Sequence, residues 1–266
     1  MDFSQPRILG QTGLKVGRLG VGAGYGAPTA AIEEAFDKGC SYLYWTSRKP
    51  GMGQAVKNIC RQGKRDNLIV VVQSYSRSAF LLEVTLKKAL KSLLVDHVDV
   101  LILGWYNKSP STRIIEKALD LKEKGFCRYL GLSGHNRSLF PELVKNGIFD
   151  LFHIRYNAAH RGAEKETFPY LGKENGPGIV SYTATRWGQL LNPKKMPAGF
   201  DPPSATDCYR FVLSNPAVDI CLCGPKDTEQ MQEALKAIEL GPLSQKEMER
   251  MRTIGDYIRE KTGKFF

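Results

Sequence analysis

The hydrophobic pattern of residues 95–136 contains one complete strand, helix and strand. The apolar run at 98–103 lies between polar residues, which is typical of a strand buried on both faces. After a helix start signal at Ser109-Pro110, apolar residues recur at helical spacing over 114–121, and a second apolar run follows at 129–132. This order predicts a parallel strand-helix-strand unit, whose functional end is where its strands pass into loops.

The same alternation of strands and helices repeats along the chain. We expect eight buried strands at residues 19–22, 42–44, 68–72, 98–103, 129–132, 151–156, 179–182 and 218–223. We expect the intervening helices to include 53–61, 78–94, 163–173, 205–213 and 227–238. A hairpin is predicted at 7–16, and Ser244 with Glu247 forms a capping box that opens a ninth helix.

Eight alternations in one chain favour a closed (β/α)8 TIM barrel, with an N-terminal β-hairpin and an extra C-terminal helix. We interpret residues 1–266 as a single domain, since barrels of this kind commonly reach this length. The alternative is an open, Rossmann-like sheet. Residues 20–26, GVGAGYG, carry the glycines of a phosphate loop but lack the rest of that motif.

Composition narrows the class of protein. Hydrophobic residues make up 42% of the chain and charged residues 24%, which are values for a globular protein with a large core. Without an apolar stretch near 18 residues or an apolar segment behind a basic N-terminus, we expect neither a membrane span nor a secretory signal. The cysteines are scattered without metal-ligand spacing, so we expect reduced core thiols in a cytoplasmic protein.

The net charge of +11 raises the question of an anionic partner. A nucleic-acid-binding chain would normally gather its basic residues on one face among aromatic residues, whereas here they are spread along the sequence. We therefore expect no nucleic-acid partner, and either a solvated surface or a site for a small anion. The four histidines share no ligand spacing, so no metal site is predicted.

Several stretches, in this order and spacing, resemble the aldo-keto reductase family over nearly the whole chain. They are LGQTGLKVGRLGVG, LKKALKSLLVDHVDVLIL, RYLGLSGHN, IRYNAAHRG, GIVSYTATRWGQLL and RFVLSNPAVDICLCGPKDTEQMQEAL. The resemblance implies a (β/α)8 barrel that binds NADPH, less often NADH, across the carboxyl ends of its strands. It also implies hydride transfer to a carbonyl compound. The expected partners are thus a nicotinamide cofactor, NADP or NAD, and a small carbonyl compound.

The resemblance also implies four catalytic residues, an Asp, a Tyr, a Lys and a His, and all four are replaced here. The hydride builds alkoxide charge on the carbonyl oxygen, so a nearby acid is required. The residues at the four matching positions are Tyr44, Lys49, Gln73 and Gly104. Ordinary carbonyl reduction should therefore be weak or absent. Tyr44 and His135 are the leading candidates for a substitute acid.

The positions that would bind the cofactor match the family better than the catalytic positions do. Ser133 and His153 match the positions that hold the nicotinamide amide, and Tyr182 matches the aromatic residue that stacks on its ring. The pyrophosphate loop would comprise Thr183, Ala184, Thr185, Arg186 and Gly188, and the adenosine segment Gly224, Lys226 and Gln230. Arg186 and Lys226 are the candidate phosphate contacts. Gln230 stands where an Arg is common, which leaves the choice between NAD and NADP open.

Three functions are compatible with these residues. The first is a nicotinamide-dependent oxidoreductase with rearranged catalytic residues. The second is a pseudoenzyme, a non-catalytic protein that binds the cofactor or a protein partner on a reductase scaffold, because function belongs to sites rather than folds. The third, a lyase or isomerase at the same end of the barrel, has no positive feature. The sequence indicates no oligomeric state.

Overall fold

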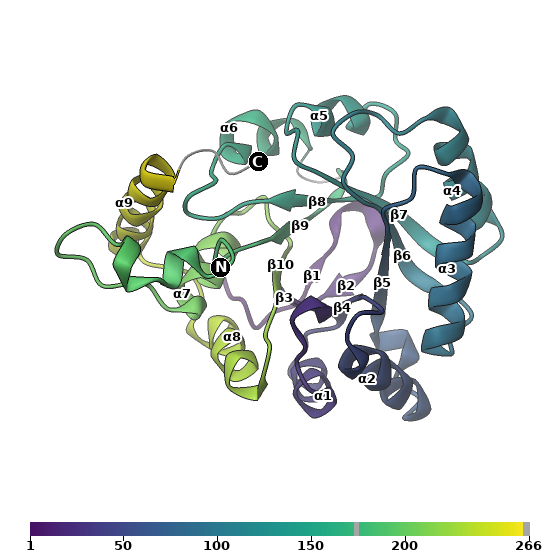
Figure 1. Ribbon diagram of the computed structural model, residues 1–266, viewed down its shortest axis with the longest axis horizontal. Helices are drawn as coiled ribbons and strands as arrows, with labels where there is room; N and C mark the ends of the chain where they lie inside the picture. The colour runs from purple at the N-terminus through teal and green to yellow at the C-terminus, as the bar shows by residue number, and fades with distance from the viewer. Residues whose placement is uncertain (173–175, 263–266) are drawn as a thin grey trace.

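The chain folds into a closed barrel of parallel strands surrounded by helices, as the computed structural model shows for residues 1–172 and 176–262 (Figure 1). The barrel strands are β3 (Leu19–Gly22), β4 (Tyr42–Trp45), β5 (Ile69–Ser74), β6 (Val98–Leu103), β7 (Cys127–Gly134), β8 (Leu151–Arg155), β9 (Gly178–Tyr182) and β10 (Ile220–Cys223). Each strand pairs in parallel with the next one along the chain, and β10 closes the barrel against β3. The predicted (β/α)8 barrel is confirmed.

Helices cover the outside of the barrel. They are α1 (Thr29–Asp37), α2 (Pro50–Arg61), α3 (Ala79–Leu93), α4 (Thr112–Glu123), α5 (Leu139–Val144), α6 (Ala163–Glu166), α7 (Ala205–Leu213), α8 (Thr228–Leu240) and α9 (Gln245–Thr262). Short 3-10 turns lie at η1 (Gly10–Thr12), η2 (Ala23–Tyr25), η3 (Arg65–Asn67), η4 (Phe168–Tyr170), η5 (Gln189–Leu191) and η6 (Pro193–Lys195). The predicted capping box of α9 is present: the Ser244 amide donates to the Glu247 carboxylate at 2.6 Å, and the Glu247 amide donates to the Ser244 hydroxyl at 3.3 Å.

Three helices differ from their predicted bounds by about three residues or more. Helix α2 begins at Pro50 instead of Gly53. Helix α4 begins at Thr112 instead of near Ser109, because the preceding loop is held at the end of β7, where the Asn107 side-chain oxygen accepts from two backbone amides. Helix α6 ends at Glu166 and gives way to η4, since Pro169 has no amide to continue the hydrogen-bond ladder. Lys173, the predicted last residue of this helix, lies outside the described residues.

Successive strand residues alternate between two hydrophobic layers, one inside the barrel and one beneath the helices. In β8, for example, Leu151 packs inside the barrel while Phe152 and Ile154 pack toward the helices. The interior layer contains Leu9, Val16, Tyr42, Ile69, Val71, Val100, Ile102, Leu151, Val180, Ile220 and Leu222. This alternation determines which polar side chains reach the mouth of the barrel.

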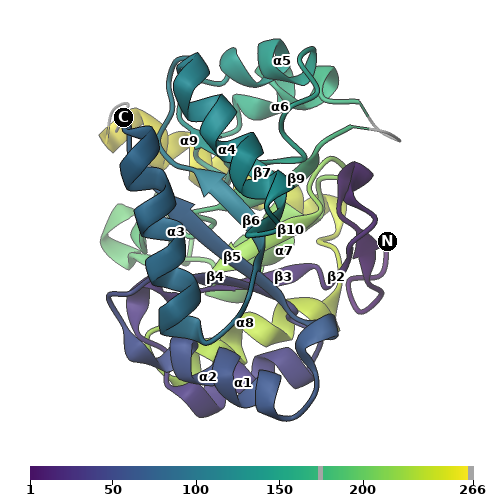
Figure 2. The same cartoon turned by 90° about the vertical axis from the view of Figure 1, so that its right-hand side faces the viewer.

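The predicted hairpin is present as β1 (Arg7–Ile8) paired with β2 (Lys15–Val16), and it closes the N-terminal end of the barrel. Leu9 and Val16, both fully buried, are part of the interior layer, and the Tyr129 hydroxyl donates to the Thr12 carbonyl at 2.6 Å. In Figure 2 this hairpin and the end of α9 lie on opposite sides of the molecule.

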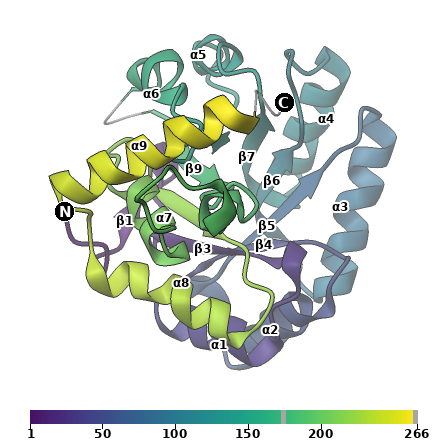
Figure 3. The same cartoon turned by 60° about the vertical axis from the view of Figure 1, so that its left-hand side comes forward.

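Helix α9 lies across the segments that follow β8 and β9 (Figure 3). Two ion pairs hold it there. Arg252 pairs with Glu164 at 2.8 and 3.0 Å, and Arg161 donates to both carboxylate oxygens of Asp256 at 2.9 Å. The extra C-terminal helix is therefore tied by ion pairs to the segment that follows β8 and packs against η5, which follows β9.

Three aspartates tie neighbouring strands together near their N-terminal ends, and we call Asp99, Asp150 and Asp219 the aspartate belt. Each carboxylate accepts a hydrogen bond of 2.8 Å from a backbone amide of the preceding barrel strand. Each also forms an ion pair with a basic side chain. The amides belong to Val70, Leu130 and Ile179, and the cations are Arg65 and Arg128 for Asp99, Lys122 for Asp150, and Arg7 for Asp219. Each carboxylate of the aspartate belt is therefore paired with a cation of the protein itself.

Within residues 1–172 and 176–262, no helix has the length and apolarity needed to span a membrane. The same part of the chain brings together no group of three or more His, Cys, Asp or Glu side chains suited to a metal ion. The cysteines are free thiols, and all but Cys60 are buried.

Candidate functional site

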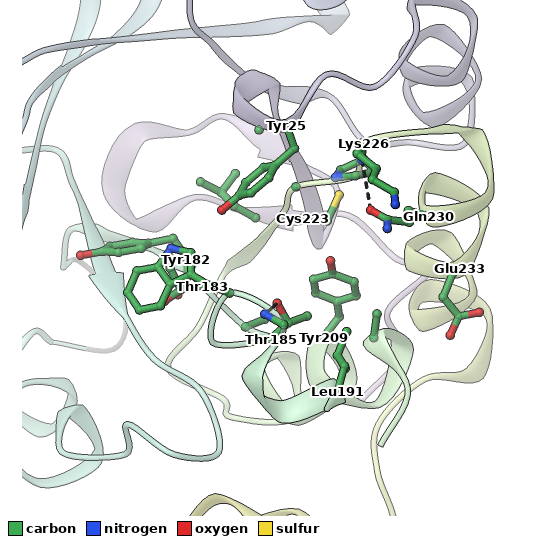
Figure 4. Close-up of a pocket in the computed structure, with 18 of the residues that line it drawn as sticks. Tyr25, Tyr182, Thr183, Thr185, Leu191, Tyr209, Cys223, Lys226, Gln230 and Glu233 are labelled. Carbon is green, nitrogen blue, oxygen red and sulfur yellow. Dashed lines mark hydrogen bonds between the residues drawn. The ribbon is translucent and has the colours of Figure 1, made fainter. Parts of the chain in front are cut away.

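A cavity of about 720 Å³ opens where β9, β10 and β3 pass into their loops (Figure 4). Tyr182 and Thr183 lie at one end, and Lys226, Gln230 and Glu233 lie at the other (Figure 4). Its lining is mainly apolar and aromatic, with contributions from Tyr25, Trp187, Leu191, Tyr209 and Leu222. Both the size and the place, at the carboxyl ends of barrel strands, are typical of a small-molecule site.

The loop after β9 enters the cavity through an unusual backbone. Thr183, Arg186 and Trp187 have positive φ angles of 61°, 51° and 52°, a conformation that costs non-glycine residues free energy. Hydrogen bonds hold the loop in this form, since the Thr183 carbonyl accepts from the Arg186 amide at 2.9 Å and from the Asn157 side chain at 2.8 Å. Strained backbone of this kind is concentrated at ligand-binding sites.

Two helix N-termini and Lys226 bring positive charge to the cavity, on whose wall the Glu233 carboxylate also lies. Ser204 and Ala205 bring the N-terminus of α7 to the cavity wall, and Lys226 lies just before the N-terminus of α8. Helix N-termini present unpaired amides and a partial positive charge. Gln230 is held in place because its side-chain oxygen accepts from the Lys226 amide at 3.1 Å.

Eight of the predicted cofactor residues meet at this cavity. They are Tyr182, Thr183, Ala184, Thr185, Gly188, Gly224, Lys226 and Gln230. The remaining three, Ser133, His153 and Arg186, do not line it. The Ser133 hydroxyl is buried, donates to the Gln73 side-chain oxygen at 3.3 Å and accepts from the Trp105 amide at 3.2 Å. Ser133 is thus already hydrogen-bonded within the protein.

His153 lies inside the barrel, with Nε2 2.8 Å from the Tyr42 hydroxyl and its ring 5.6 Å from that of Tyr44. Burial lowers the pKa of His153 to about 3, so the imidazole is neutral at physiological pH. The Arg186 side chain is fully buried as well, below the loop that carries it. Of the two predicted phosphate contacts, only Lys226 therefore faces the cavity.

The four positions that match the family's catalytic residues lie in different surroundings. Tyr44 lines the cavity, where burial, and next the neighbouring Tyr75, raise the pKa of its phenol. Lys49 is exposed at the start of α2 and lies beside Gly26. Gln73 lies over Gly104: a Cβ built on Gly104 would be only 2.5 Å from the Gln73 side-chain nitrogen. Gln73 therefore fills the space that a side chain at position 104 would need.

His135 belongs to a row of aromatic rings along the rim of the barrel. Its Nδ1 lies 3.2 Å from the Tyr182 hydroxyl, and its ring lies 6.4 Å from that of Trp105, which in turn packs against Tyr75 at 5.4 Å. Burial, and then the charge of Arg155, lower the pKa of His135, while burial raises that of Tyr182. Both groups are therefore neutral near pH 7.

Two residues of this region carried no recognisable sequence signal. Tyr209 lines the cavity from α7, but in the sequence it is one of several apolar residues of a buried helix. Arg155 follows His153 by two residues at the end of β8 and has only 9% of its surface exposed. In the sequence it is one of many basic residues, and its burial could not be inferred.

The fold is similar to that of solved aldo-keto reductases. The holo form of aldo-keto reductase AKR11C1 from Bacillus halodurans superposes with a TM-score of 0.77 over 94% of this chain and 96% of that one, at 20% identity. Among curated proteins, L-galactose dehydrogenase of Arabidopsis thaliana is 23% identical, over 87% of each chain. The uncharacterized oxidoreductase YqkF of Bacillus subtilis is 22% identical, over 93% of this chain and 95% of its own.

The model of the Aldo/keto reductase family matches residues 29–207, which is more than half of the chain. The chain therefore belongs to the aldo/keto reductase family. Members of this family are oxidoreductases that use nicotinamide cofactors.

Proposed function

We propose that the cavity binds NADPH or NADH and that the protein is an aldo-keto reductase-like oxidoreductase whose ordinary carbonyl reduction is weak or absent. One observation carries the cofactor proposal: eight residues chosen from separate stretches of sequence come together around one cavity. The holo form of the similar Bacillus halodurans reductase gives the proposal further support.

The described residues fit such a cofactor along the length of the cavity. Tyr182 offers an aromatic face at one end, the strained loop and the N-terminus of α7 offer main-chain amides in the middle, and Gln230 with Lys226 lies at the other end. Bound there, the cofactor would supply a hydride for transfer to a carbonyl carbon. We leave NAD and NADP as alternatives.

The proposal of weak reduction rests on the proton that the carbonyl oxygen must receive. The raised pKa of Tyr44 makes it a poor donor, and His135 is mainly neutral because its pKa is lowered. Neither Gln73 nor Gly104 carries an acidic group. A positioned acid contributes about 10² to 10⁴ in rate. We therefore expect turnover of common aldehydes at least about a hundredfold below the roughly 1 to 10³ s⁻¹ of ordinary enzymes.

The packing of Gln73 over Gly104 favours a second candidate, a non-catalytic protein that binds the cofactor or a protein partner. The two candidates share the cofactor site and differ in turnover. For both we propose a cytoplasmic location, which the free thiols support.

Cofactor binding can be tested by tryptophan fluorescence, because Trp187 lines the cavity. Titration with NADPH or NADH should give saturable quenching, and Tyr182→Ala should weaken binding by about 0.5 to 1.5 kcal/mol. Tyr170→Ala, which removes an exposed tyrosine of η4, is the matched control and should leave affinity unchanged. The proposal fails if neither dinucleotide gives a saturable signal up to millimolar concentration.

Turnover is measured as NADPH oxidation at 340 nm with a panel of aldehydes, ketones and quinones. We expect less than about one turnover per second on every compound. A faster reaction that is abolished by Tyr44→Phe or His135→Ala would contradict the proposal of weak reduction. It would also assign the role of the acid to the residue whose loss abolished the reaction.

A further inference from the structure

The side chains inside the barrel are arranged in layers, because alternate residues of each strand point inward. Ser133 of β7 is in register with His153 of β8, and the Tyr42 contact of His153 shows that this level faces the interior. Two residues further along lie His135, which directly follows β7, and Arg155, the last residue of β8. Arg155 is in register with Tyr182 of β9. We call His135, Arg155 and Tyr182 the mouth layer.

Arg155 is buried in this layer without a counterion. Only 9% of its surface is exposed, and within residues 1–172 and 176–262 its guanidinium has neither a hydrogen bond nor an ion pair. Solvent still reaches the guanidinium nitrogens, which are not among the fully buried side-chain atoms that lack a partner. Arg18, on the N-terminal side, shows the usual outcome for a buried arginine. It is 3% exposed and donates to the carbonyls of Leu213, Val218 and Asp219 at 3.2, 2.9 and 2.9 Å.

The surroundings of Arg155 are cationic. Arg137, which adds to the positive charge, is already paired with Glu166 through two hydrogen bonds of 2.9 and 3.0 Å. His160, 8% exposed, is close enough to Arg155 and Arg186 for their charges, after burial, to lower its pKa to about 4. Its Nε2 is buried, and we find no hydrogen-bond partner for it among the described residues. Arg155 is therefore a largely buried cation that no group of the described residues pairs with, and a bound anion can pair with it.

We propose that Arg155 binds the carboxylate of a small oxo acid at the mouth layer, beside His135 and Tyr182, and thereby selects acidic carbonyl compounds as substrates. The planar fork of a guanidinium matches the two oxygens of a carboxylate. Tyr182 belongs both to this layer and to the cavity, so the anion would lie next to the proposed nicotinamide end. The choice of substrate rests on the proposed function, whereas anion binding by itself does not.

Binding of pyruvate and of its neutral ester, methyl pyruvate, tests the proposal directly. Trp105 reports on the site, because its ring lies 6.4 Å from that of His135. We expect the wild-type protein to bind pyruvate at least about tenfold more tightly than the ester, and Arg155→Met to abolish this preference. Arg113→Met, which removes an exposed arginine of α4, is the matched control for net charge and should keep the preference.

Three results would overturn the proposal: equal affinity of the wild type for pyruvate and the ester, a preference for pyruvate that survives Arg155→Met, or a loss of NADPH affinity in this variant as large as its loss of pyruvate affinity. The last result would assign Arg155 to the cofactor. The titrations are made both with and without NADPH. Failure of the cofactor proposal would therefore appear as missing dinucleotide binding, while the pyruvate comparison would still be decided.

A stability measurement separates this role from a structural one. If Arg155 lacks a partner in the free protein, Arg155→Met should unfold at a higher temperature than the wild type, and saturating pyruvate should reduce or reverse the difference. A structural arginine would behave in the opposite way. A lower unfolding temperature for Arg155→Met than for Arg113→Met, or failure of the variant to fold, would show that Arg155 has a structural partner and would overturn the proposal.

Discussion

Charged residues are buried at both ends of the barrel, but they are treated differently. At the N-terminal end, each carboxylate of the aspartate belt accepts a backbone amide and meets a cation. At the C-terminal end, Arg155 is buried beside His135 and Tyr182 without a counterion among the described residues. Removing one member of a buried, paired set leaves its partners unpaired and destabilises the fold, whereas a buried charge that has no partner costs free energy unless a ligand pairs with it. Removing a charge should therefore lower the free energy of unfolding in the aspartate belt and raise it at Arg155.

The largest effect on stability should come from the belt. Asp99→Ala removes a carboxylate that is 1% exposed, leaving the Val70 amide and two arginines without their acceptor, and should lower the free energy of unfolding by about 3 kcal/mol. Chemical denaturation measures this loss. Asp37→Ala, which breaks an exposed pair with Lys64, should cost less than about 1 kcal/mol. Equal costs would remove the distinction between belt and surface.

At the C-terminal end, restoring one family residue should harm stability without restoring activity. Gly104→His places a side chain where Gln73 already lies, so we expect a loss of about 1 to 3 kcal/mol and no gain in NADPH-dependent turnover. Adding Gln73→Ala should recover much of the stability, which a double-mutant cycle can measure. A single Gly104→His variant that turns over aldehydes above about one per second would refute this account of the site.

Between the two ends, His153 should make stability depend on pH. Its pKa is about 3 in the folded protein, below the ordinary value of 6.5, so its contribution is complete above pH 6.5 and is lost as the pH falls toward 3. His153→Gln should remove this term, which amounts to about 2 kcal/mol at pH 5. Denaturation of both proteins at pH 7 and pH 5 measures it. Parallel pH dependences would show that His153 is not the group responsible.

The smallest effect should come from the exposed end of the cavity. Lys226→Ala should weaken NADPH binding by less than about 1 kcal/mol, because the side chain is 65% exposed and its interactions are screened. If Lys226 meets a 2′-phosphate, the loss should be larger for NADPH than for NADH and should shrink at high salt. Unchanged affinity for both cofactors would assign Lys226 to the solvated surface.

The barrel was predictable because its strands are short apolar runs separated by helical patterns. Residues 19–22 and 98–103 were predicted with the bounds that the structure has. The start of α4 was missed because Ser109 resembles a helix cap, whereas the side-chain contacts of Asn107 decide where this loop runs. Helix starts depend on such long-range contacts, and the spacing of apolar residues along the sequence does not reveal them.

The site was predictable where a motif places several residues in one loop, as for residues 183–188 and 224–230. It was less predictable where neighbouring strands meet. The hydrogen bonds of Ser133 depend on Gln73 and Trp105, which come from other strands or their ends. Likewise, the state of Arg155 is defined by a missing counterion, which only the folded structure can reveal.

The packing of Gln73 over Gly104 also imposes an order on any mutational path toward a conventional reductase. With Gln73 in its present position, a new Cβ at residue 104 would overlap the amide of Gln73, so the Gln73 side chain would have to turn away and give up its hydrogen bond with the Ser133 hydroxyl. Shortening residue 73 first avoids this cost. A selection experiment for carbonyl reduction should therefore recover changes at position 73 before changes at position 104, so the accessible routes are fewer than four independent replacements would suggest.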